Sequence, residues 1–164
     1  IIERRFGPLT YVPARDVLHI RLHTPRNPLK GETPLMAAAG LGMEPSPRFN
    51  PSANDAQDRA IATLELLSAA GANVNARITD VTSRTARMGR ASTLPERGGQ
   101  SALFGATQWA WPRVVRYLID HGAEVAIVDD RRVSPLDAAL GRAGSSDNRP
   151  SPEVAKILQT AISQ

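Results

Sequence analysis

Three histidines are the side chains in this chain best suited to metal chemistry. His19 and His23 share one face whether their segment is a helix or a strand, and His121 could complete a set of three zinc ligands. No carboxylate motif accompanies them. The chain has no cysteine, which excludes thiolate metal sites, disulfides and cysteine nucleophiles. We therefore expect no metal site and no cofactor.

Acidic and glycine-rich motifs give no better basis for catalysis. Asp129 and Asp130 are adjacent, whereas paired catalytic carboxyl groups need contrasting environments. Gly40 and Gly42 flank Leu41 after an expected helix, and a dinucleotide-binding loop would instead join a strand to a helix. We predict that the protein is not an enzyme and has no catalytic residues.

Arginine supplies the first candidate binding site. Residues 77–98 form a basic finger whose net charge of +3 accounts for most of the chain's +4. Its arginines are Arg77, Arg84, Arg87, Arg90 and Arg97. Such a finger suits an acidic protein surface or, as the less favoured alternative, nucleic-acid phosphates. A solvated or scaffold-packed loop is the structural alternative.

Tryptophan supplies the second candidate. Trp109 and Trp111 flank Ala110 at the end of an expected helix and in the turn that follows it. An exposed tryptophan is a typical anchor for a protein partner. The structural alternative is that these rings cover the core of a neighbouring unit or an inserted loop.

The composition is that of one globular domain. The chain has 164 residues, of which 41% are hydrophobic, and no apolar run approaches the roughly 18 residues of a membrane span. Aromatic residues make up only 4%, which favours closely packed short helices over a sheet sandwich. The first residue is Ile1, without an initiator methionine or signal segment, which indicates a processed or partial chain.

One nine-residue pattern occurs three times and predicts three helix starts. A hydroxyl residue (Thr33, Ser101 or Ser134) precedes an apolar, alanine-rich segment in each copy, and the last two copies are 33 residues apart. The copies are residues 31–39, 99–107 and 132–140. Pro34 and Pro135 follow the hydroxyl residue at the first helical position, where no backbone N–H is needed.

A second pattern predicts helix ends. Gly71 and Gly122 follow apolar segments and each precedes an alanine, which is typical of a left-handed helix cap. Apolar side chains within the expected second helices predict the faces that these helices turn toward the core. They are Leu64, Leu67, Val115, Leu118 and Leu158.

These segments resemble the ankyrin repeat, a pattern of about 33 residues with Thr-Pro-Leu-His at the first helix and Gly-Ala after the second. The resemblance implies an all-α solenoid of about three to four helix-turn-helix units, of a bacterial type with long inserted loops. It also makes Asp129 and Asp130 similar to the acidic tip of an ankyrin hairpin. The histidine of the motif is replaced by Met36, Phe104 and Asp137, which predicts a weaker hydrogen-bond network there.

The spacing of the motifs divides this single domain, residues 1–164, into unequal parts. Residues 14–23 fit either a helix or a strand, and the prolines around them favour an extended arm. The predicted parts are an N-terminal arm or degenerate unit (1–30), a unit (31–76) with an inter-helix insertion (43–59), the inserted basic finger (77–98), a regular unit (99–131) and a C-terminal capping unit (132–164).

The resemblance implies a non-catalytic protein-protein interaction module that binds a partner through its concave face and inserted loops. The alternatives are a structural subunit of a larger multiprotein assembly and nucleic-acid binding by the basic finger. No motif identifies the partner, the compartment, the oligomeric state or whether further repeats precede residue 1.

Overall fold

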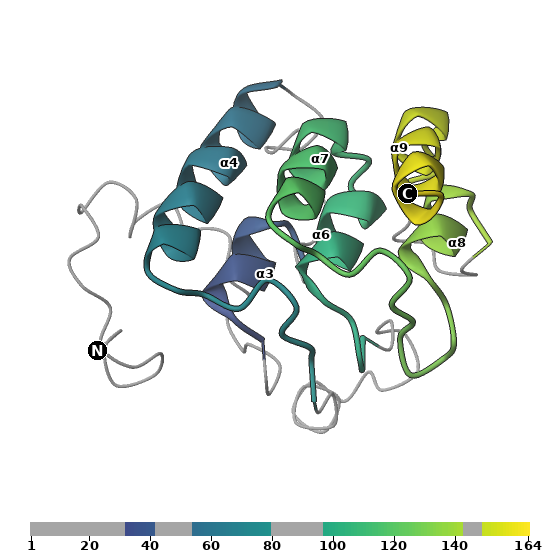
Figure 1. The fold of residues 1–164 in the computed structure, drawn as a ribbon, viewed down its shortest axis with the longest axis horizontal. Coiled ribbons are helices and arrows are strands. Elements are labelled where there is room, and N and C mark those ends of the chain that lie inside the picture. The colour runs from purple at the N-terminus through teal and green to yellow at the C-terminus, as the bar shows by residue number, and fades with distance from the viewer. Residues whose placement is uncertain (1–31, 42–53, 80–96, 143–148) are drawn as a thin grey trace, which may run out of the picture.

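The described part of the chain is built from helices. The computed structural model describes residues 32–41, 54–79, 97–142 and 149–164, and these residues contain no strand (Figure 1). Their helices are α3 (Pro34–Ala38), α4 (Asn54–Ala69), α6 (Ala102–Gln108), α7 (Pro112–Asp120), α8 (Pro135–Ala139) and α9 (Pro152–Ile162). The all-α prediction is confirmed for these residues. The predicted arm 1–30, including residues 14–23, lies outside them.

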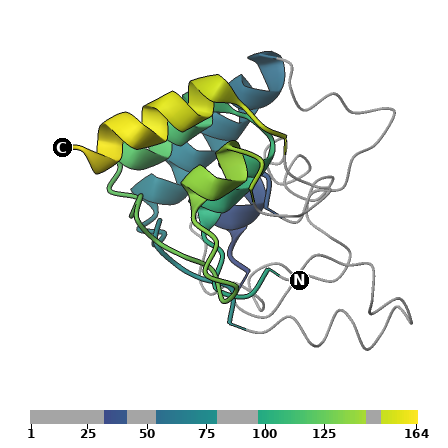
Figure 2. The same ribbon diagram turned by 90° about the vertical axis from the view of Figure 1, so that its right-hand side faces the viewer.

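The helices form two layers. A short helix packs against the longer helix that follows it in each of the pairs α3–α4, α6–α7 and α8–α9. Figure 1 shows α4, α7 and α9 in one row, with α3, α6 and α8 in a second row beneath them. Figure 2 views the stack from the side of α9, which lies above α8 with the other pairs behind. The architecture is therefore one helix pair repeated and stacked side by side.

Hydroxyl side chains begin two of the short helices, as predicted. The Thr33 hydroxyl accepts a hydrogen bond from the Met36 N–H at 3.3 Å, and the Met36 sulfur accepts one from the Thr33 N–H at 3.5 Å. Ser134 and Asp137 make the same reciprocal pair at the start of α8. The predicted weakening of the network is wrong at these two starts, because Met36 and Asp137 both act as acceptors.

The start of α6 differs from the other two. Ser101 occupies the N-cap position, but its side chain makes no capping hydrogen bond. Phe104 stands three residues later and has no group that could accept a bond from the Ser101 N–H. The prediction of a weaker network is therefore confirmed only at this helix.

Left-handed residues follow every described helix except α9, whose C-cap Ser163 has φ −88°. Gly71 and Gly122 have φ values of 82° and 84°, which confirms the two predicted caps. The N–H groups of Ala72 and Ala123 close each turn on the carbonyls of Leu67 and Leu118. Gly40 and Gly141 end α3 and α8 in the same way, while Ala110 with φ 55° takes this position after α6.

The core lies between the two layers. All five side chains predicted for the second-helix core are buried, namely Leu64, Leu67, Val115, Leu118 and Leu158. The short helices contribute Leu35, Met36, Leu103 and Phe104 from the opposite side. Neither layer could bury its apolar face alone, so the stacking itself stabilises the fold.

The predicted insertion 43–59 is too long at its C-terminal end. Helix α4 begins at Asn54, so residues 54–59 are helical. Ala56 and Ala60 extend the buried face toward the N-terminus, and the Gln57 side chain accepts a hydrogen bond from the Arg113 N–H at 3.1 Å. This bond satisfies a free backbone donor in the first turn of α7 and joins the N-terminal turns of α4 and α7.

Candidate binding surface

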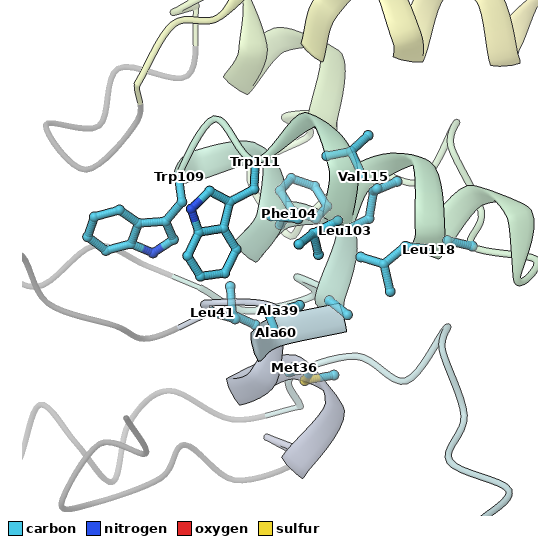
Figure 3. Close-up of a cluster of buried hydrophobic side chains, with 14 of the residues drawn as sticks. Met36, Ala39, Leu41, Ala60, Leu103, Phe104, Trp109, Trp111, Val115 and Leu118 are labelled. Carbon is cyan, nitrogen blue, oxygen red and sulfur yellow. The ribbon is translucent and has the colours of Figure 1, made fainter. Parts of the chain in front are cut away.

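The two tryptophans are buried, so the prediction that they are exposed partner anchors is wrong. The exposed fraction is 4% for Trp109 and 1% for Trp111. Figure 3 shows their rings side by side, with Trp111 between Trp109 and Phe104 and Leu41 below. The alternative interpretation, that they cover the core of a neighbouring unit, describes both residues.

Trp109 contacts the end of α3 on one side and Arg149, which precedes α9, on the other. The Trp109 Nε1–H donates a hydrogen bond to the Gly40 carbonyl at 2.9 Å, so the polar edge of the buried ring is satisfied. A Cβ atom on Gly40 would lie 2.7 Å from the Trp109 ring. The Arg149 guanidinium covers the ring at 4.7 Å from its centroid, a cation–π geometry.

Gly105 allows the first and second units to approach each other. A Cβ atom at this position would lie 2.4 Å from the Leu41 backbone nitrogen and 2.9 Å from the Ala39 carbonyl oxygen. Backbone therefore meets backbone at this point, and only glycine leaves enough space. The close contact brings the end of α3 beneath the two tryptophans.

The two arginines of the predicted finger that the structure describes are engaged within the protein. Arg77 is exposed, but its Nε donates to the Gly99 carbonyl at 2.8 Å and its Nη2 donates to the Val128 carbonyl. Arg97 is only 5% exposed and donates to the Gln108 side chain at 3.1 Å. Arg84, Arg87 and Arg90 lie outside the described residues. The scaffold-packed alternative therefore describes Arg97, and Arg77 joins two loops.

A buried chain of polar side chains crosses from Arg97 to the next loop. Gln108 accepts from Arg97 and donates to Gln100 at 3.2 Å, and Gln100 donates to Asp129 at 3.2 Å. The Asp129 carboxylate also pairs with Arg131 at 3.2 Å. Because these groups are shielded from water, losing one partner would leave a buried polar atom unpaired, which fixes the positions of the loops that carry them.

The loops that connect successive units form one edge of the molecule, which we call the loop edge (residues 72–79 and 123–133). Figure 1 shows both loops extending from the same side of the helix stack. The Asn75 side chain joins them, because its amide donates to the Gly122 carbonyl at 2.9 Å and its oxygen accepts from the Glu124 N–H at 2.8 Å. The Asp130 N–H donates to the Gly98 carbonyl at 3.0 Å.

Several side chains project from the loop edge into solvent. Val128 is the large apolar residue among them and is 43% exposed. The other exposed residues of the loop edge are Asn73, Arg77, Thr79, Glu124, Ala126, Asp130 and Arg132. This mixture of one large apolar side chain with charges of both signs could contact another protein.

The predicted contribution of the short helices to a concave binding face is limited by α6. Every residue of α6, from Ala102 to Gln108, is buried. The central short helix therefore offers no exposed side chain to a partner.

The histidines do not form a metal site in the described residues. His121 is exposed, stacks on the Tyr117 ring and contacts the Tyr117 carbonyl through Nδ1 at 2.8 Å. His19 and His23 lie outside the described residues. In the part of the chain that the structure describes, no three His, Asp or Glu side chains gather where they could hold a metal ion. Within the same residues, no helix has the length and apolar character needed to span a bilayer.

Comparison with known proteins gives no assignment, because no family model matches the chain and no curated protein matches it at a significant level. The class that the geometry defines is a stack of helix pairs with a cross-linked loop edge.

Sequence reasoning missed the polar residues that fix this edge. Gln100 and Gln108 were not singled out, although they are eight residues apart at the start and end of the segment that contains α6. Two buried glutamines have no characteristic spacing, so no local pattern could have identified them. Asp129 was placed at a hairpin tip from the resemblance, and the structure places it buried within the turn.

Proposed function

We propose that this chain is an ankyrin-repeat module that binds another protein and catalyses no reaction. Three stacked helix pairs support this proposal, because each short helix packs against the longer helix that follows it and α6 contacts both α3 and α8. The resemblance comes from the residue identities of the motifs, and the stacking is seen in the contacts between helices.

The observation that carries the proposed function is the hydrogen bonding along the loop edge. Asn75, Arg77 and Asp129 each join or fix the loops from which the exposed side chains project. A partner that binds there would not have to order a flexible loop, so less of the interaction free energy would be lost on association. The loop edge is thus suited to recognition of a folded or extended protein surface.

The two arginines of the basic finger that the structure describes do not favour nucleic-acid binding as a second function. Arg77 and Arg97 use donors for hydrogen bonds within the protein, and Arg97 is buried. Phosphate binding needs guanidinium groups that are accessible from solvent.

The test is affinity capture with a substituted loop edge. The wild-type protein, Val128→Glu and the control Gln159→Glu would each be immobilised and exposed to a lysate of the source organism, and the retained proteins identified by mass spectrometry. Gln159 is exposed on α9, so its substitution adds the same charge away from the loop edge. We expect at least one protein to be retained by the wild type and the control and reduced about tenfold by Val128→Glu, a loss of about 1.4 kcal/mol. Equal retention by all three proteins would refute the proposed surface.

A further inference from the structure

Arg132 has a backbone conformation that is unfavourable for arginine. Its φ is 64°, in the left-handed region that side chains with a Cβ seldom adopt. The equivalent residue of the preceding unit, also two residues before the helix N-cap, is Gly99 with φ 76°. The third copy of the motif has Gly31 at this position. Arginine is therefore found where the other two copies have the residue best suited to the backbone.

The turn around Arg132 imposes this conformation. One carboxylate oxygen of the buried Asp129 accepts hydrogen bonds from the N–H groups of Arg131 and Val133, both at 2.9 Å. The Asp129 carbonyl accepts a third bond from the Arg132 N–H, also at 2.9 Å. These bonds would be lost if the backbone relaxed, so the strain at Arg132 is held by the turn.

No contact within the described residues compensates for this strain. The Arg132 side chain is exposed, and within residues 32–41, 54–79, 97–142 and 149–164 it makes no hydrogen bond, ion pair or ring contact. The adjacent Arg131 differs, because its guanidinium pairs with the Asp129 carboxylate. Arg132 thus presents all of its side-chain donors to solvent from a fixed backbone.

We infer that Arg132 binds a carboxylate of the partner, and that this partner contributes an acidic segment at the loop edge. The inference rests on the proposed function and specifies the chemistry of its partner. Strained backbone positions cluster at ligand-binding sites, and the fixed fork of a guanidinium matches the two oxygens of a carboxylate. Because the backbone of Arg132 is already fixed by the turn, only its side chain loses conformational freedom on binding.

The experiment measures binding and stability together. The probe is a short fluorescein-labelled polyglutamate peptide, and its affinity is measured by fluorescence anisotropy at low salt. We expect Arg132→Gly to weaken binding about tenfold, as expected for a lost charge-assisted hydrogen bond, and to raise the melting temperature by about 2–4 °C. The opposite signs of the two effects distinguish a binding residue from a structural one.

Two control variants isolate these effects. Ala110→Gly relieves the same kind of strain at the other non-glycine residue with positive φ among the described residues, so it should raise the melting temperature without changing peptide affinity. Arg59→Gln removes an exposed arginine from α4 and should leave the affinity within about twofold of the wild type.

Three results would overturn the inference. An unchanged affinity in Arg132→Gly would identify Arg132 as a tolerated but unused residue. Equal weakening by Arg59→Gln would show unspecific attraction of the peptide to a positively charged protein. Failure of the wild type to bind the peptide would exclude an acidic segment as the ligand, while the capture experiment with Val128→Glu would still decide whether the loop edge binds proteins.

Discussion

Replacing Thr107 by valine should stabilise the protein, because the threonine hydroxyl is buried without satisfying its hydrogen-bonding capacity. Thr107 lies within the fully buried helix α6 and is 0% exposed. Its Oγ1 atom has no hydrogen-bond partner among the described residues. Valine has nearly the same shape and a similar helix propensity, so the substitution changes little except the polarity of one buried atom.

The expected magnitude follows from the cost of burying an unpaired polar group. Mutational data place that cost at about 1–3 kcal/mol. Because the cavity is already shaped for a group of this size, we expect Thr107→Val to raise the free energy of unfolding by about 1 kcal/mol. For a chain of this length, the gain corresponds to an increase of about 2–4 °C in the melting temperature.

Thr63→Val is the matched control. Thr63 is also buried in a helix, but its hydroxyl donates a hydrogen bond to the Arg59 carbonyl at 2.9 Å. The same chemical change removes a satisfied bond, so we expect a neutral effect or a loss of up to about 1 kcal/mol. The comparison between the two variants removes effects that are common to any Thr-to-Val substitution.

Urea unfolding followed by circular dichroism measures both variants. Fluorescence gives a second probe, because the chain's two tryptophans, Trp109 and Trp111, are both buried and would become exposed on unfolding. Coincident transitions by the two probes would justify two-state analysis. A Thr107→Val protein that is less stable than the wild type, or no more stable than Thr63→Val, would refute the reasoning.

Three further predictions concern packing and capping. Gly105→Ala should lower the free energy of unfolding by about 1–3 kcal/mol, because the Cβ of alanine would lie 2.4 Å from the Leu41 nitrogen. This loss should outweigh the better helix propensity of alanine. An unchanged urea midpoint would contradict the close contact. Leu118→Ala should lower the free energy of unfolding by about 2–5 kcal/mol in the same assay, since Leu118 is completely buried. A negligible loss would show that Leu118 does not lie in the core. Hydrogen bonds from the Ser134 hydroxyl and N–H hold the pKa of Asp137 below its ordinary value of 3.8. The carboxylate therefore contributes stability above pH 3.8, and this contribution is lost as the pH falls through the pKa of the folded state. Urea midpoints measured from pH 7 into acid should therefore show Asp137→Asn less stable than the wild type at neutral pH, with the difference narrowing in acid; a constant difference would argue against this contribution.

The helix ends could be predicted from the sequence because their physics is local. A hydroxyl residue before a proline, as at Thr33 and Ser134, offers an acceptor to a free N–H a few residues away. Glycine at positions 71 and 122 accommodates a left-handed turn whatever packs around it. Each rule needs only neighbours in sequence, and the structure confirms these four positions.

The fate of the tryptophans could not be predicted in this way. Their burial depends on the backbone at Gly40, which contacts both rings, and on the close contact of Gly105 with Leu41, which joins two helix pairs. An aromatic ring in a turn has the same local sequence whether a neighbouring unit covers it or not. Sequence reasoning left both possibilities open, and only the arrangement of the units distinguishes them.

The arginines of residues 77–98 show a related limit. The sequence predicts a basic finger and leaves open whether it is exposed or packed on the scaffold, and the structure shows Arg97 buried against Gln108 and Arg77 joining two loops. Guanidinium groups often donate to backbone carbonyls or amide side chains, and such partners have no charge pattern that reveals them. The net charge of a segment therefore does not tell how many of its charges face solvent.

The complete burial of α6 has a consequence for how the protein opens. This helix touches α3 on one side and α8 on the other, and the side chain of Gln108 at its end also belongs to the polar chain that reaches Asp129. Its amide protons cannot reach water through fraying of either terminal pair alone. We expect native-state hydrogen exchange to be slowest in α6, where it should occur only through global unfolding. The amide protons in the middle of the stack would then exchange only after both neighbouring helix pairs have separated.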